Sequence, residues 1–123
     1  MDWKFTPDRP VYQQIMALLR GAIVTGELPP GGKVPSVREL AAQAQVNPNT
    51  MQRALTELER EALLVSGGTS GRTVTQDQGV IQALRQRVLE ALARECVEKF
   101  RVFGISPREA GALLATLEEE EEA

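Results

Sequence analysis

Residues 36–62 read SVRELAAQAQVNPNTMQRALTELEREA, and this stretch decides the fold of the N-terminal part. Ser36, followed three residues later by Glu39, has the form of a capping box, in which each side chain satisfies a backbone N–H group. Asn47 before Pro48 is a second helix start, because asparagine caps a helix and proline fits the first helical turn. Two short helices joined by a tight turn predict a helix-turn-helix.

An amphipathic pattern on three segments predicts a three-helix core around this motif. A longer helix precedes it, starting at Pro10 and ending at Gly26, and the stretch 29–32 that follows, Pro-Pro-Gly-Gly, cannot be helical. Apolar residues recur at three- and four-residue steps in all three helices, as expected for faces that pack together. These positions are Tyr12, Ile15, Leu19, Ala22, Ile23, Val37, Leu40, Ala41, Ala44, Met51, Ala54, Leu55, Leu58 and Ala62.

The residues after the third helix predict a small hairpin. Leu63–Val65 is typical of one strand, Arg72–Thr75 of a returning strand, and residues 67–71 of the glycine-rich turn between them. A helix-turn-helix followed by a hairpin is the winged-helix arrangement. We therefore expect a mainly α fold with a small β-hairpin wing, forming a winged helix-turn-helix domain over residues 1–76.

Residues 77–123 carry a different pattern, typical of two amphipathic helices and an acidic tail. Gly104 ends the first helix, and Ser106 opens the second with another capping box. Two helices cannot cover each other's apolar faces completely, so we expect two C-terminal dimerisation helices that pack against a second copy of the chain. The predicted dimerisation residues are Ile81, Leu84, Val88, Leu92, Phe100, Leu113 and Leu117. Glu118–Glu122 is expected to be a solvated, disordered tail.

Composition argues against most enzyme classes. The 123 residues include no histidine and one cysteine, so histidine-based catalysis, imidazole metal sites and internal disulfides are excluded. Cys96 is expected to be a buried apolar residue, and the glycine-rich turn lacks the Lys-Ser/Thr pair of a phosphate-binding loop. We expect no enzymatic activity, no cofactor and no metal. Without a signal peptide or a long apolar run, the chain is expected in the cytoplasm, away from membranes.

The net charge of −3 is concentrated in the C-terminal part. Residues 1–78 hold eight basic and eight acidic residues, whereas the remainder holds six basic and nine acidic ones. Binding to DNA depends on cations placed locally against phosphates. The acidic total therefore does not exclude DNA as a partner of the N-terminal part.

Several motifs in the N-terminal part follow one another in the order and spacing of a known family. They are Pro10-Val11-Tyr12-Gln13-Gln14-Ile15, Gly26-Glu27-Leu28-Pro29-Pro30-Gly31, Val34-Pro35-Ser36-Val37-Arg38-Glu39-Leu40-Ala41 and Val46-Asn47-Pro48-Asn49-Thr50, the last followed by Arg53-Ala54-Leu55. Over about residues 8–75 the chain resembles the DNA-binding domain of the GntR family of bacterial regulators. The short C-terminal part is similar to that of the YtrA-like subfamily, in which two helices serve dimerisation.

The start of the third helix carries the candidate DNA-reading side chains. Asparagine and glutamine pair with adenine, and arginine pairs with guanine or phosphate. The resemblance implies that Arg38 also reaches DNA and that Ser36 touches phosphate besides capping its helix. In the wing, Gly71 fits the family pattern but its neighbours depart from it, which leaves Arg72 either as a DNA contact or as a solvent-facing strand residue. The candidate DNA-binding residues are Ser36, Arg38, Asn47, Pro48, Asn49, Thr50, Gln52, Arg53, Gly71 and Arg72.

These features together predict a transcriptional regulator, more specifically a repressor that binds a pseudo-palindromic operator as a homodimer. Asn47, Asn49, Thr50 and Arg53 would discriminate the sequence, and Arg38 would fix the register. Two other interpretations stay open. A winged helix also serves as a protein-interaction module, whose acidic C-terminus would engage a basic partner. A ligand-sensing regulator would instead bind an unidentified small-molecule effector among the apolar residues of the C-terminal helices, although a dimer core needs the same residues.

Overall fold

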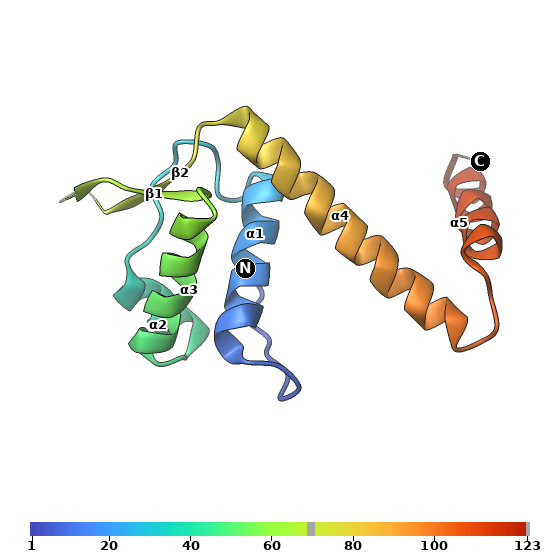
Figure 1. Cartoon of the computed structure of the whole chain (residues 1–123), viewed down its shortest axis with the longest axis horizontal. Helices are drawn as coiled ribbons and strands as arrows, with labels where there is room; N and C mark the ends of the chain where they lie inside the picture. The colour runs from blue at the N-terminus through green and yellow to red at the C-terminus, as the bar shows by residue number, and fades with distance from the viewer. Residues whose placement is uncertain (69–70, 123) are drawn as a thin grey trace. The chain divides into compact units, whose positions relative to one another are not determined.

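A computed structural model describes residues 1–68 and 71–122, and in that part it contains five helices and two strands (Figure 1). They are α1 (Val11–Thr25), α2 (Val37–Ala44), α3 (Pro48–Arg60), β1 (Leu64–Ser66), β2 (Arg72–Val74), α4 (Gln78–Arg101) and α5 (Pro107–Glu122). The predicted turn residues Thr69 and Ser70 lie outside the described part. The elements follow the predicted order, which confirms a mainly helical fold with a small hairpin wing.

The chain forms two compact units whose boundary lies inside α4. The first unit comprises Met1–Arg85, and the second begins at Gln86. The domain boundary predicted after residue 76 stays a prediction, while the contacts within the chain group the first turns of α4 with the winged helix. Leu84 shows why, because its side chain is 0% exposed. It is therefore covered by its own chain and not exposed for a partner, unlike the predicted dimerisation role.

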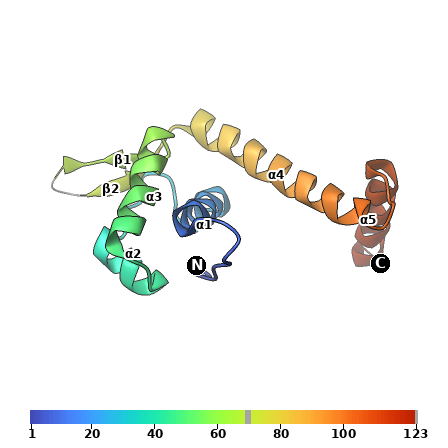
Figure 2. The same ribbon diagram turned by 60° about the horizontal axis from the view of Figure 1, so that its bottom comes forward.

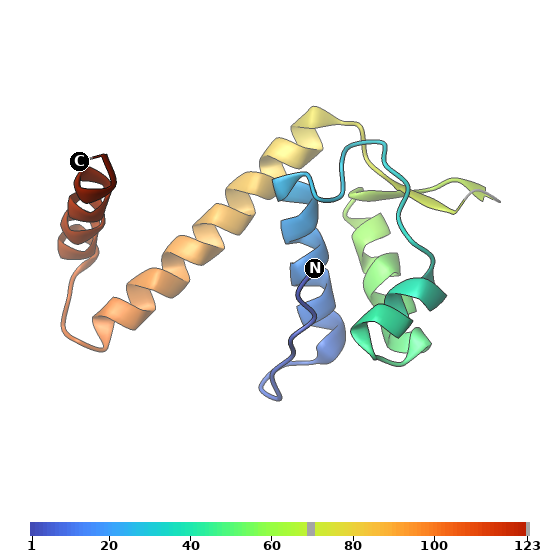
Figure 3. The ribbon, with the colours of Figure 1, turned by 180° about the vertical axis from the view of Figure 1, so that it is seen from behind.

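Three helices form the core of the first unit. In Figures 1 and 3, α1 and α3 run side by side and begin at the same end, and α2 also packs against α3. The packing follows the predicted apolar stripes, and its fully buried side chains include Ile15, Leu19, Leu40, Met51, Leu55 and Leu58. Tyr12, predicted to be in this core, is only half-buried.

The helix starts in the decisive stretch have the predicted geometry. The Ser36 hydroxyl oxygen accepts a hydrogen bond from the Glu39 N–H at 3.1 Å. The Asn47 side-chain oxygen accepts one from the Asn49 N–H at 2.8 Å. By contrast, α1 starts one residue later than expected, with Pro10 in the capping position.

The wing is bonded to the loop that leads into α2. Strand β2 pairs antiparallel with β1, in a register that places Leu64 opposite Val74. On its other side, the Val34 N–H donates to the Arg72 carbonyl at 2.9 Å, and the Val74 N–H donates to the Gly32 carbonyl at 2.9 Å. The hairpin, which extends beyond the helices in Figure 2, is thus anchored next to the start of α2.

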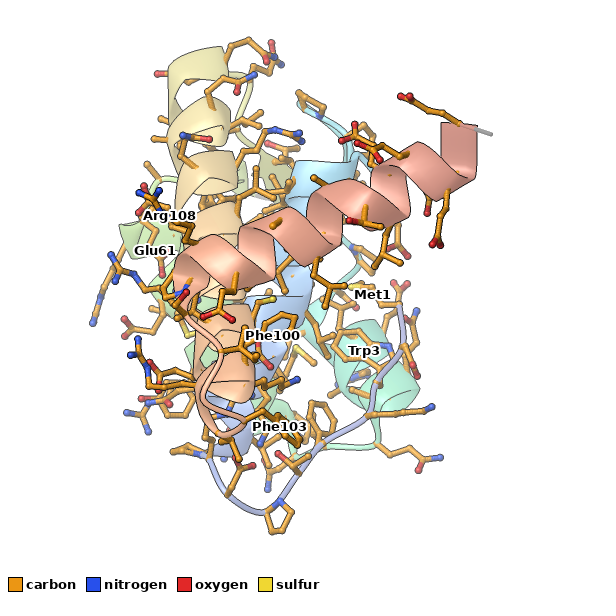
Figure 4. All side chains as sticks on the ribbon, turned by 90° about the vertical axis from the view of Figure 1, so that its right-hand side faces the viewer. Met1, Trp3, Glu61, Phe100, Phe103 and Arg108 are labelled. Atoms are coloured by element: carbon orange, nitrogen blue, oxygen red, sulfur yellow. The ribbon has the colours of Figure 1, made fainter. Side chains whose placement is uncertain are left out.

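One buried polar side chain attaches the N-terminal segment to α1. The Gln14 amide donates to the carbonyls of Thr6 and Arg9 at 2.8 and 2.9 Å and accepts from the Thr6 N–H at 2.8 Å. The Thr6 hydroxyl also donates to the Asp8 carboxylate, and this hydrogen bond is the main cause that lowers the pKa of Asp8. At the start of the segment, labelled in Figure 4, the Met1 amino group pairs with Glu27 at 3.0 Å.

Helix α5 continues through Glu122, so the predicted disordered tail is wrong over the described residues. Glutamate is a good helix former, and the run Glu118–Glu122 extends a helix that is already nucleated. Cys96 is half-buried rather than buried. Among the described residues, no helix has the length and apolar character required to cross a bilayer.

Candidate nucleic-acid interface

The first turn of α3 presents a cluster of exposed polar side chains. Asn47, Asn49 and Gln52 are exposed, and Thr50 is half-buried. The cap at the start of α3 fixes the backbone from which these side chains project. This is the end of the second helix of a helix-turn-helix that contacts base edges in the major groove.

The start of α2 adds a groove that is lined by three basic residues and one acidic residue, Glu39. The groove has a volume of about 720 Å³ and runs between the N-terminal end of α2 and strand β2. Its lining includes Lys33, Ser36, Arg38, Gly71 and Arg72. The structure therefore brings together four of the predicted DNA-binding residues, and it adds Lys33, for which the sequence leaves a surface role and a contact to the DNA backbone equally open.

Every acidic residue of the segment 1–78 has a polar partner. On α3, Glu57 pairs with Arg60 at 2.8 Å, Glu61 accepts two hydrogen bonds from Arg20, and Glu59 pairs with Arg72. Hydrogen bonds or ion pairs also engage the others, namely Asp2, Asp8, Glu27, Glu39 and Asp77. Each of the three glutamates on α3 and its C-terminal cap is thus paired with an arginine, and α3 is called the recognition helix below.

Four cations of the same segment form no ion pair with any of the described residues. They are Arg9, Lys33, Arg38 and Arg53. Lys33 and Arg38 line the groove beside α2, and Arg53 lies on α3. A segment of zero net charge therefore still offers cations that are free of ion pairs among the described residues, with Arg53 on α3 and with Lys33 and Arg38 in the groove.

Two predicted contact residues are engaged within the chain. Arg72, the candidate of the wing, is half-buried and bound to Glu59. Arg53 stacks over the ring of Tyr12, with 3.7 Å between its guanidinium carbon and the ring centroid. Neither partner was visible from the sequence, because each pair joins two elements whose alignment depends on the folded structure.

The second unit exposes several large apolar side chains. Of the predicted dimerisation residues, Leu92, Leu113 and Leu117 are 59%, 51% and 49% exposed. Ile81, Val88 and Phe100 are half-buried. Val102 and Phe103, which are not among the predicted dimerisation residues, are 82% and 81% exposed. Figure 4 labels Phe100 and Phe103 at the end of α4 and in the turn that follows.

The polar residues at the start of α3, namely Asn47, Asn49, Thr50 and Gln52, are called the reading turn below. A winged helix-turn-helix that presents such a turn, together with cations that form no ion pair, defines a DNA-binding protein. Residues 11–74 match the family described as bacterial regulatory proteins, gntR family. This match spans more than half of the chain, and the protein therefore belongs to that family. Its members are transcriptional regulators and not enzymes.

Individual relatives agree with this assignment, two of them along most of the chain. The HTH-type transcriptional regulator YhcF of Bacillus subtilis is 32% identical over 109 residues, which cover 89% of this chain and 90% of YhcF. The transcriptional repressor YtrA of the same organism is 46% identical over 55 residues, covering 45% of this chain and 42% of YtrA. A solved GntR family regulator from Listeria monocytogenes has a TM-score of 0.81 and 32% identity, covering 91% of this chain and 98% of that one.

Proposed function

We propose that this regulator is a repressor that binds a pseudo-palindromic operator as a homodimer. The observation that carries the proposal is the distribution of charge. Each of the three glutamates on α3 and its C-terminal cap is in an ion pair with an arginine, whereas Arg53 on α3 and Lys33 and Arg38 in the groove beside α2 form no ion pair with any described residue. Phosphate groups of a duplex are the partners that such a surface accepts.

The two groups of side chains have different tasks in this proposal. Asn47, Asn49, Thr50 and Gln52 face the base edges, where amide side chains pair with adenine. Arg38 and Lys33, in the groove beside the wing, bind phosphates and fix the register of the helix. Pro48 and Gly71 act by shaping the backbone, at the start of α3 and in the groove. Ser36 adds a phosphate contact through its hydroxyl.

The exposed leucines of the second unit support the homodimer. Leu92, Leu113 and Leu117 are each about half exposed, which is costly for three large apolar side chains in water. A second copy of the chain would cover them and place two copies of α3 on the DNA. A two-fold symmetric protein matches a two-fold symmetric site.

Repression follows from the size of the complex on DNA. Two winged helices on adjacent major grooves would occupy a promoter and exclude RNA polymerase, and the similar protein YtrA is named a repressor. The protein would act in the cytoplasm, where the bacterial genome lies. Neither a cofactor nor a metal is part of this function, and a small-molecule effector would be detected as a thermal shift with a metabolite panel.

Selection from random duplex DNA tests the proposal. The expected result is one enriched motif with two-fold symmetry, whose binding weakens steeply as salt rises. Failure to enrich any sequence at low salt, or binding without salt dependence, would contradict it and favour a protein-interaction module.

A further inference from the structure

The contact between Arg53 and Tyr12 joins the recognition helix to the first helix. The guanidinium carbon of Arg53 lies 3.7 Å from the centroid of the Tyr12 ring, within the range of a cation–π contact. Tyr12 is in the first turn of α1, and Arg53 is in the second turn of α3. The two helices run side by side and begin at the same end (Figures 1 and 3), which allows the contact.

Stacking leaves the hydrogen-bonding edge of the guanidinium unused. A separation of 3.7 Å is that of a guanidinium lying flat over the ring, an arrangement in which the N–H donors point outward in the plane of the group. Glu57, one turn further along α3, is bound to Arg60 at 2.8 Å, and Arg53 has no ion pair among the described residues. Arg53 is exposed, so an anion can reach these donors.

We propose that Tyr12 is a positioning residue that holds Arg53 ready to bind a phosphate of the DNA backbone. The inference rests on the proposed function. The stack turns Arg53 toward α1, which lies at the side of α3, whereas the base edges face the turn of Asn47 and Asn49. The flank of a helix in the major groove faces the phosphates at the groove wall, and a planar guanidinium fits a phosphate with two hydrogen bonds.

The stack improves binding because it orders the side chain in advance. A free arginine loses much rotamer freedom when it is fixed on a ligand, and the contact with Tyr12 has already restricted it. Phenylalanine preserves the aromatic face, whereas leucine fills the space without it. Tyr12→Phe and Tyr12→Leu therefore form a matched pair that separates stacking from packing.

The experiment measures the Kd of the full-length protein for the duplex recovered by selection, over a range of salt concentrations. Tyr12→Phe is expected to bind like the unchanged protein. Tyr12→Leu is expected to bind about two- to fivefold more weakly, the contribution of an exposed cation–π contact. Thermal unfolding of both variants controls for the fold, because Tyr12 is half-buried and its hydroxyl accepts a hydrogen bond from Gln13 at 3.3 Å.

Arg53→Ala, combined with Tyr12→Leu, completes a double-mutant cycle. We expect about tenfold weaker binding, equal for all operator variants, and a decrease of about 0.9 in the slope of log Kd against log salt. Adding Tyr12→Leu to Arg53→Ala should then weaken binding no further, because the positioned group is gone.

Two results would overturn the inference. One is additive loss in the double variant, which would mean that Tyr12 acts independently of Arg53. The other is an Arg53→Ala variant with an unchanged salt slope and altered preference at one base pair, which would make Arg53 a base-reading residue. An unchanged protein that binds no duplex would contradict the proposed function itself, whereas normal binding by Tyr12→Leu contradicts only the role of Tyr12.

Discussion

At the scale of single residues, Asn47 combines a structural and a functional role that one pair of substitutions separates. Its side-chain oxygen caps α3 at 2.8 Å, so Asn47→Ala should lower the free energy of unfolding by about 1 kcal/mol in urea titrations. Asn47→Asp keeps the cap and should keep the stability. Its negative charge at the reading turn should nevertheless weaken operator binding, and equal binding by Asn47→Asp would remove this turn from the DNA interface.

Arg38 and Arg72 line one groove but differ in their internal partners. Arg72 is bound to Glu59, so Arg72→Gln should lower the free energy of unfolding by about 1 kcal/mol and leave the salt slope of DNA binding unchanged. Arg38 is exposed and has no ion pair among the described residues. Arg38→Gln should therefore preserve stability and reduce that slope by about 0.9. The reverse pattern would show that the wing arginine binds phosphate.

Residue types, but not residue pairs, could be predicted from the sequence. Ser36 and Asn47 can be identified as caps because the capping oxygen and the N–H group that donates to it lie within three residues of each other. The stacking of Arg53 on Tyr12 and the pairing of Arg72 with Glu59 join residues far apart in the chain. Such pairs depend on how helices and strands align, which periodicity does not contain.

At the scale of elements, the end of α3 stores backbone strain. The Ala62 N–H donates to the Glu59 carbonyl at 2.9 Å and the Leu63 N–H to the Leu58 carbonyl at 3.1 Å, the hydrogen bonds of a Schellman motif. Ala62 sits at its left-handed position with a φ of 64°, a conformation that favours glycine.

Ala62→Gly should therefore raise the free energy of unfolding by about 0.5–1 kcal/mol, the relief of strain less the extra freedom of the unfolded chain. The matched change is Gly26→Ala at the end of α1, where φ is 83°. It should destabilise by about 1 kcal/mol, because it introduces the same strain. Equal signs for the two variants in urea titrations would refute this explanation.

Helix boundaries could be predicted where the sequence contains a full capping motif or a terminating glycine. The capping boxes predicted the starts of α2 and α5, and Gly104 predicted the end of α4 within a few residues. The acidic run after Leu117 does not form the expected disordered tail, because a run of like charges does not by itself prevent a helix. Glutamate has a high helix propensity, and α5 extends through Glu122.

At the scale of the whole molecule, the proposed dimer predicts a change of mass. Leu92→Glu and Leu117→Glu each replace an exposed apolar side chain with a charged one. The chain should still fold, because these positions are exposed, but it should remain monomeric in sedimentation equilibrium, because a charge would be buried in the dimer. Ala112→Glu, on the other face of α5, is the control and should remain dimeric. A dimer that persists in both leucine variants would place the interface elsewhere.

Whole-molecule organisation was only partly accessible from the sequence. The winged helix and two further helices could be predicted, since each element has its own pattern. The assignment of Leu84 could not, because one apolar stripe runs along α4 while its first turns belong to the winged-helix unit. An apolar stripe predicts that a helix face is buried. Only the folded structure shows whether the same chain covers that face.

The measurement that tests the account most directly is the mass of the complex on the selected duplex, by sedimentation, alongside a duplex in which one half-site is scrambled. We predict two chains per symmetric duplex, and binding weaker by about a hundredfold when one half-site is lost. One chain per duplex, with equal affinity for the intact and the half-scrambled site, would contradict the dimeric operator-binding mechanism.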